Sequence, residues 1–325
     1  MRKPVLDWNG STDGMKEPSA PLAKLAFPTS VDAQLPDIQR TRRQFLGYGL
    51  PAACVALAPR SVLAAPKAPL WTVKKGGKRI YVLGETLPRP VDWRAPEIVA
   101  LLERCGRLWT ETNQIYRRPG GELIKQFGMS TSPSSLELLS PEQLARLKTA
   151  MALTAVSMND LAGARPWLIG ATIEDAGYRA AGLTGKSANA VLSARATEIG
   201  VPVSSEFEVK DDVFAWFAGM TPKQEAQFLC YAVDGALLGR EGSERISTEW
   251  LAGRQTAAAD FVDHERRDYP ELYAKLTVER NRAWVPRFET MLNAPKPTLV
   301  VVGLYHLVGP ESMLVQLRRA GFEVI

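Results

Sequence analysis

The stretch that most constrains the fold is the carboxyl-terminal one, residues 298–325. Residues 298–302 form an apolar, β-branched run of strand length, which ends at Gly303. Between Gly309 and Gly321 the apolar residues recur at helical spacing, and the short run that follows is typical of a second strand. The order strand, helix, strand predicts a βαβ unit.

A polar pair, Tyr305-His306, comes just after the first of these strands. In open α/β sheets, ligands bind at the carboxyl ends of the strands. His306 is one of only two histidines in the chain. It is therefore either part of a functional site or a hydrogen-bonded core residue without chemistry.

The start of the folded region has the same order of elements. Two short strand-like runs flank a turn at 74–78, and the second run ends at Gly84. A helix is predicted over about 95–103 and a further strand over 108–111. We therefore predict two terminal βαβ-like units that share one sheet, with a cleft between them.

The region between these units, from about 120 to 295, has a mainly helical pattern. Ser140 and Thr221 each precede a proline, which is typical of an N-cap followed by the first helical turn. A long final helix is predicted over 269–292. No linker interrupts the pattern, so we predict a single mixed α/β (α+β) domain over 66–325.

The residues before this domain are typical of an export signal. Residues 1–40 are polar and rich in proline, which predicts a disordered leader. Residues 41–65 combine two arginines, an apolar run and a small-residue cleavage site, the pattern of a twin-arginine signal peptide. The residues that carry this pattern are Arg42, Arg43, Phe45, Leu46 and Ala64.

This apolar run is too short to span a bilayer. We therefore expect the twin-arginine export machinery to deliver the protein to the periplasm, with no transmembrane anchor in the mature chain. Residues 1–64 hold 8 of the 40 Lys and Arg and 5 of the 35 Asp and Glu, so 32 and 30 remain. That balance, without a basic stripe, gives no support for nucleic-acid binding. Cys105 and Cys230 remain as either a periplasmic disulfide or two buried thiols.

Four segments resemble one known family. They are GLYH at 303–306, ARPWL at 164–168, TEWLAG at 248–253 and ERNRAW at 279–284. Together with the strand that ends at Gly84, they are similar to the TraB/PrgY/GumN family, relatives of the Tiki metalloproteases. The resemblance covers residues from about 70 to 325, and its most specific part is the carboxyl-terminal segment.

The resemblance implies a divalent metal that activates water to hydrolyse a peptide-like bond. The family signature consists of two Gly-x-x-His motifs and an acidic residue on the strand after the first motif. The second motif is intact from Gly303 to His306, and Glu111 matches the acidic residue. The first motif begins at Gly84, but its histidine position is Leu87, which has no lone pair for a metal.

A hydrolytic site needs about three protein ligands and an open position for water. The expected set is His306, Glu111 and either Glu85 or Glu206, and such an oxygen-rich set favours manganese, cobalt or magnesium. Glu111 or Glu85 could act as general base. Arg280 could neutralise a carboxylate, polarise a scissile carbonyl, or fix its helix to the sheet. The remaining binding positions that the resemblance suggests are Gly84, Gly303, Tyr305 and Asn281.

The alternative to a hydrolase is a catalytically degenerate protein that binds a peptide or an envelope-derived small ligand without cutting it and holds no metal. Each residue also has a simpler interpretation. Glu111 could cap a helix or pair with Arg280, and Glu206 could be a plain surface carboxylate. His264, four residues after Asp260, is expected on a solvated helix face.

Overall fold

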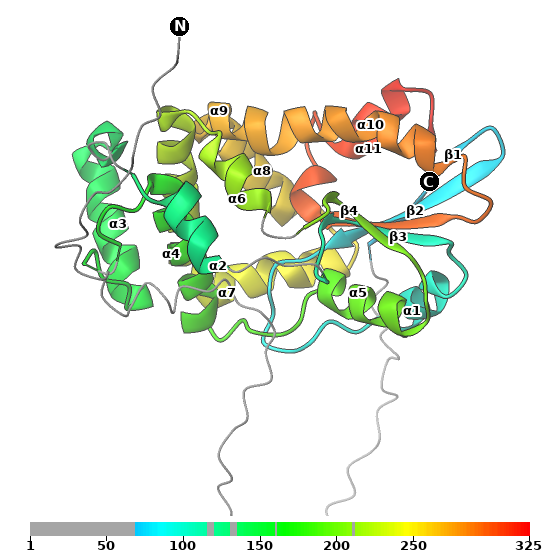
Figure 1. The fold of residues 1–325 in the computed structure, drawn as a ribbon, viewed down its shortest axis with the longest axis horizontal. Coiled ribbons are helices and arrows are strands. Elements are labelled where there is room, and N and C mark those ends of the chain that lie inside the picture. Colours follow the sequence, from blue (N-terminus) through cyan, green and yellow to red (C-terminus); the bar gives the residue numbers. More distant parts are fainter. Residues whose placement is uncertain (1–68, 116–119, 131–134, 160, 210–211) are drawn as a thin grey trace, which may run out of the picture.

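The computed structural model describes residues 69–325 except 116–119, 131–134, 160 and 210–211. The predicted leader and the signal residues Arg42, Arg43, Phe45, Leu46 and Ala64 lie outside the described residues. The described part forms a mixed sheet with helices on both faces and a helical region beside it, which confirms the predicted fold class (Figure 1).

One six-stranded sheet organises the molecule, in the order β4-β3-β5-β2-β1-β6. Four strands of this sheet are parallel to one another, namely β4, β3, β5 and β2. Strand β1 is antiparallel to both β2 and β6. Its strands are β1 (Leu70–Lys75), β2 (Lys78–Glu85), β3 (Arg107–Thr112), β4 (Val203–Phe207), β5 (Thr298–Gly303) and β6 (Glu323–Val324).

The two terminal units share this sheet, as predicted. β5 lies between β2 and β3, so the last parallel strand in the chain is inserted into the first unit. Its first five residues are all buried, as a β-branched run in a covered parallel sheet should be. The register pairs Gly84 with Val302 and Glu85 with Gly303, so both glycine motifs leave the same edge of the sheet.

Helices cover both faces of the sheet (Figure 1). α1 (Pro96–Leu102) and α5 (Ala188–Glu198) pack on one face over Leu83, Leu108 and Leu299. α10 (Glu279–Met291) and α11 (Met313–Arg319) pack on the other, where Trp284 joins the larger apolar cluster. This larger cluster includes Leu87 and Leu304, which follow the two motif glycines, and so fixes the position of both motifs.

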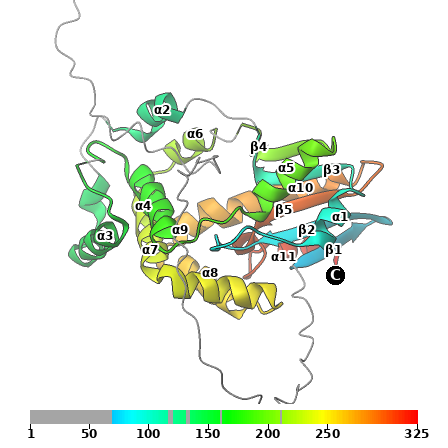
Figure 2. The same ribbon diagram turned by 90° about the horizontal axis from the view of Figure 1, so that it is seen from below.

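The helical region is built beside the sheet around Trp167 and Phe228 (Figure 2). Ser140 and Thr221 form capping boxes at the starts of their helices, as the sequence predicts. The long helix contains one non-helical residue, Gly239. The elements are α2 (Gly120–Leu123), α3 (Pro141–Thr154), α4 (Pro166–Ala180), α6 (Val213–Ala218), α7 (Pro222–Leu251), α8 (Thr256–Asp268) and α9 (Pro270–Tyr273).

Two helix predictions need correction. The helix after β5 begins at Met313 with Ser312 as its N-cap, because Gly309 adopts a left-handed turn (φ 86°) instead of starting the helix. The predicted final helix over 269–292 is divided by a π-helical turn, Ala274–Val278. No helix of the described residues is long and apolar enough to cross a membrane.

The two cysteines of the domain are both buried and free. Burial raises the pKa of each thiol to about 11. They are therefore inert core residues rather than a disulfide or a nucleophile.

Candidate functional site

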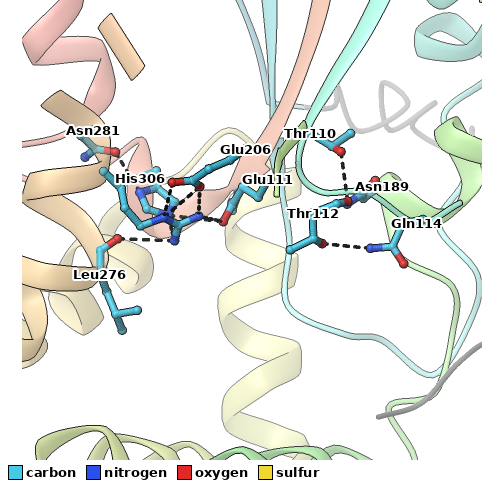
Figure 3. A network of polar contacts seen from close by, with 11 residues as sticks. Thr110, Glu111, Thr112, Gln114, Asn189, Glu206, Leu276, Asn281 and His306 are labelled. Atoms are coloured by element: carbon cyan, nitrogen blue, oxygen red, sulfur yellow. Dashed lines mark hydrogen bonds and ion pairs between the residues drawn. The ribbon is translucent and has the colours of Figure 1, made fainter. Parts of the chain in front are cut away.

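A polar cluster lies at the carboxyl ends of β3, β4 and β5 (Figure 3). Glu111 is near the end of β3, and Glu206 is near the end of β4. After Gly303 the chain forms the short turn η6 (Leu304–His306), which places His306 beside them. Arg280, from α10, enters the cluster from the helix that covers this face.

Arg280 is the centre of the cluster. Its Nη2 atom donates to Glu111 Oε2 at 2.8 Å and to Glu206 Oε2 at 2.6 Å, and its Nε atom donates to Glu206 Oε2 at 3.0 Å. The three side chains are only 12%, 23% and 11% exposed, respectively. The guanidinium also lies 5.0 Å from the centre of the Trp284 ring. This is a buried, charge-assisted bridge between two strands and a helix.

Glu111 is held in its ionised form. Burial alone would raise the pKa of this carboxyl, but the charge of Arg280 and the hydrogen bond from the Gly303 N–H outweigh burial and keep the pKa well below its usual range. The N–H of Gly303 donates to Glu111 Oε1 at 2.5 Å. The carboxylate therefore ties the end of β3 to the start of the His306 turn.

His306 is buried and has a defined tautomer. Its Nε2 atom lies 3.2 Å from Arg280 Nη1, and since a guanidinium can only donate, Nε2 accepts. Its Nδ1 atom then carries the proton and donates to Asn281 Oδ1 at 2.8 Å. The amide of Asn281 is fixed because its Nδ2 donates to the carbonyl of Glu311 at 2.9 Å.

The imidazole of His306 is neutral. Burial lowers its pKa, and the charge of Arg280 lowers it further, against the opposing effect of Glu111. The distance of 3.6 Å from His306 Nε2 to Glu111 Oε2 is too long for a hydrogen bond, so the contact with Arg280 decides the tautomer.

The first glycine motif lies next to this cluster but is packed differently. A β carbon at Gly84 would lie 2.4 Å from the ring of Trp250, so only glycine fits there. Leu87 is 8% exposed and belongs to the same apolar cluster as Trp250. Glu85 accepts from the backbone N–H of Asn189, at the start of α5, at 3.0 Å. The positive end of the α5 dipole explains why the Glu85 carboxylate points toward the start of that helix.

The arrangement does not fit a divalent metal ion. Among the described residues, no group of three or more His, Cys, Asp or Glu side chains could hold one. Atoms that would serve as ligands on Glu111, Glu206 and His306 are hydrogen-bonded to the guanidinium of Arg280. A metal would have to displace this cation, and the position that could supply a further imidazole is Leu87 in an apolar cluster.

The structure brings together most of the predicted site residues. The interpretation that Glu111 pairs with Arg280 is confirmed. The interpretation of Glu206 as a surface carboxylate is wrong, because it is buried against Arg280. Tyr305 packs on Phe261, with ring centres 5.2 Å apart.

Sequence reasoning missed the connections that hold these residues. The carbonyl of Glu311 orients Asn281, and the backbone N–H of Asn189 donates to Glu85. Nothing in the spacing of the sequence predicts either pair. His264 was expected on a solvated face with Asp260, but it lies between Asp234 and Asp268. The contact with Asp268 could have been predicted, because residues four apart on a helix are neighbours.

Comparison with known proteins supports the resemblance in the sequence. A model of the TraB/PrgY/gumN family matches residues 69–325, the full span of the described structure. No curated protein and no solved structure matches the chain significantly. The match includes both glycine motifs, the acidic strand and the helix that carries Arg280 and Asn281. The chain therefore belongs to the TraB/PrgY/gumN family.

Proposed function

We propose that this protein is an exported family member that binds a peptide or an envelope-derived small ligand, without a divalent metal and without cutting it. The observation that carries the proposal is the guanidinium of Arg280 between Glu111 and Glu206. A built-in cation already neutralises one of the two carboxylates and uses the free lone pair of His306. Water activation by a metal has no support from this arrangement.

The charges of the cluster indicate the kind of ligand. Two carboxylates and one guanidinium, with a neutral imidazole, leave a net charge of about −1. The side chain of Glu111 is the most exposed of the three charged groups. A ligand with a free amine or with peptide N–H donors suits such a site, because carboxylate oxygens only accept hydrogen bonds.

Calorimetric titration with manganese, cobalt and magnesium tests the metal-free part of the proposal. We expect no binding tighter than about millimolar by protein purified without chelator. Stoichiometric binding at micromolar affinity would overturn the proposal and support a metal-dependent hydrolase instead. Arg280→Met serves as the comparison, since it removes the competing cation while Glu111, Glu206 and His306 remain.

A screen with short synthetic peptides tests the binding part. We expect peptides with free amino termini to shift the thermal unfolding of the wild type, and Glu111→Gln to reduce that shift. Glu289→Gln is a matched control, because Glu289 is an exposed glutamate on α10 that pairs with Lys75 outside the cluster. Equal shifts in all three proteins would place binding elsewhere.

Export to the periplasm by the twin-arginine route is part of the same proposal. It is supported by the sequence pattern around Arg42 and Arg43. Replacing both arginines with lysine should abolish accumulation in the periplasmic fraction. Unchanged periplasmic accumulation of that variant would contradict this route.

A further inference from the structure

α8 covers the turn that carries His306. It lies along α7 and contacts η6, extending from the helical region toward the sheet (Figure 2). Phe261 packs on Tyr305 with ring centres 5.2 Å apart. Val262 approaches the turn after η6 so closely that a β carbon at Gly309 would lie 3.0 Å from its Cγ1 atom. Any loosening of α8 therefore frees one side of this turn.

One attachment of α8 is an imidazole between two carboxylates. His264 Nε2 lies 3.0 Å from Asp234 Oδ2 on α7, and Nδ1 lies 2.5 Å from Asp268 Oδ2 at the end of α8. Carboxylates only accept hydrogen bonds, so both ring nitrogens must carry protons to make both contacts. A neutral ring would instead turn a lone pair toward one of the carboxylates.

The groups around this imidazole keep their own charge states. Asp234 also accepts from the hydroxyl of Tyr269 at 2.6 Å and from Arg146, on α3, at 2.5 Å. Burial would raise the pKa of Asp234, but the hydrogen bonds from Tyr269, His264 and Arg146 lower it overall. Burial raises the pKa of Tyr269, and Cys230, one turn before Asp234, is a neutral thiol.

A second titratable group lies on the inner side of α8. Glu265 is 2% exposed, and its Oε1 atom has no hydrogen-bond partner among the described residues. Tyrosines from three elements lie near it: Tyr231 of α7, Tyr273 of α9 and Tyr305 of η6. Burial raises the pKa of this carboxyl to about 8. Once ionised, it would be a buried charge without a cationic partner, which is unfavourable.

We propose that α8 is a pH-dependent cover of the His306 turn, tied to α7 through His264 and Asp234 and loosened when the buried, unpaired carboxyl of Glu265 ionises. The contact of His264 with Asp234 ties α8 to α7, whereas its contact with Asp268 lies within α8 itself. Ionisation of Glu265 then favours any state in which water reaches the carboxylate.

The sign follows from proton linkage. In an open α8, Glu265 would have an ordinary pKa of about 4.3, whereas in the closed state its pKa is about 8. Between these values the closed state binds one more proton, so rising pH favours opening. The open population should rise about tenfold for each pH unit in that window. Regulation of ligand access by this motion rests on the proposed function, but the motion itself does not.

Hydrogen exchange of α8 amides, corrected for the intrinsic rate, tests the motion without a ligand. Between pH 6 and pH 8 we expect α8 exchange to accelerate relative to α4, by about tenfold per pH unit where local opening dominates. Glu265→Gln should flatten this dependence, because glutamine stays neutral. His264→Gln should raise α8 exchange at pH 6 as well as at pH 8, because it removes the imidazole that contacts Asp234 on α7.

Arg240→Gln is the matched control, since it breaks an exposed ion pair with Glu244 on α7 and should change nothing. Exchange of α8 that is independent of pH relative to α4 would overturn the proposal. So would an unchanged pH dependence in Glu265→Gln, which decides the question even if His264→Gln does not fold. If the motion is found but peptides bind equally at pH 6 and pH 8, the cover does not regulate the site.

Discussion

The two glycine motifs begin one residue out of register on neighbouring parallel strands, and their surroundings are opposite. Gly303 ends β5 and Gly84 is the residue before the end of β2, and the pairing of these strands places the motifs side by side. After Gly303, His306 joins a network with Asn281 and Arg280. After Gly84, Leu87 is buried in the apolar cluster. A place at the same edge of the sheet therefore does not determine whether a motif becomes polar or apolar.

The helices that face the two motifs account for the difference. α10 directs a guanidinium and an amide at the carboxyl end of β5. α7 instead directs the Trp250 ring at β2, so close that Gly84 has no room for a β carbon. Polar partners therefore surround the Gly303 motif but not the Gly84 motif, and the following variants test how far the two surroundings differ.

The largest effect is expected for Arg280→Met. It leaves the carboxylates of Glu111 and Glu206 buried without their cation, which should lower the free energy of unfolding by about 3–5 kcal/mol. Arg282→Met, an exposed change on the same helix, should stay within about 0.5 kcal/mol of the wild type. Urea unfolding measures both, and equal values would show that the polar side is not held by Arg280.

The next largest loss of stability is expected for Leu87→His, which restores the missing histidine of the first motif. Because Leu87 is in an apolar cluster, the imidazole would be buried without a good partner, and the free energy of unfolding should fall by about 2–3 kcal/mol. Leu87→Met should cost less than about 1.5 kcal/mol. Manganese binding by Leu87→His with no loss of stability would remove the contrast between the motifs.

A matched pair of alanine substitutions compares the two glycines directly. Gly84→Ala would press a β carbon into the buried ring of Trp250 and should cost about 1–3 kcal/mol. Gly303→Ala has an ordinary φ of −59°, and its β carbon would lie 3.3 Å from Glu111 Oε1 and 3.9 Å from Tyr305 Cδ2, so about 1 kcal/mol or less is expected. Thermal unfolding of both variants gives the difference, and a larger loss for Gly303→Ala would reverse the comparison.

The smallest effect is a pH dependence from His306. Its pKa is lowered in the folded protein, so the unfolded chain binds more protons and the folded state loses stability as pH falls below about 6.5. The loss is at most about 1.4 kcal/mol per pH unit. His306→Gln should lack it, so the stability advantage of the wild type over this variant should shrink from pH 7 to pH 5.

Glu111 and Glu265 do not disturb this comparison. The low pKa of Glu111 means that its contribution is lost only below about pH 4.3, outside the range tested. The slope due to Glu265 is the same in both proteins and cancels. A constant difference between the two proteins from pH 7 to pH 5 would show that His306 is not held neutral.

The sequence predicts the parts of this site that depend on local pattern. Strand-ending glycines, the polar pair after β5 and the N-caps Ser140 and Thr221 all follow from short-range rules. These rules place Glu111 and His306 at one edge of a sheet. They cannot tell which distant helix lies opposite that edge.

The contacts that sequence reasoning missed are long-range. Glu206 and Arg280 are 74 positions apart, and Glu85 and Asn189 are 104 apart. Spacing shows which face of an element a residue occupies, but the partner on that face depends on how the helices pack. For this reason the surface interpretation of Glu206 was wrong, and the contact of Glu85 with Asn189 was not predicted.

The insertion of β5 between β2 and β3 has a consequence for how the protein is made. Until residues 298–303 have been synthesised, β2 and β3 have no common neighbour, and neither half of the sheet can be completed. Such pairing over long sequence separation is slow, because the closing of a large loop precedes any gain from contacts. The molecule should therefore acquire its native core only after translation has passed this strand, and a nascent chain stalled before it should remain sensitive to protease.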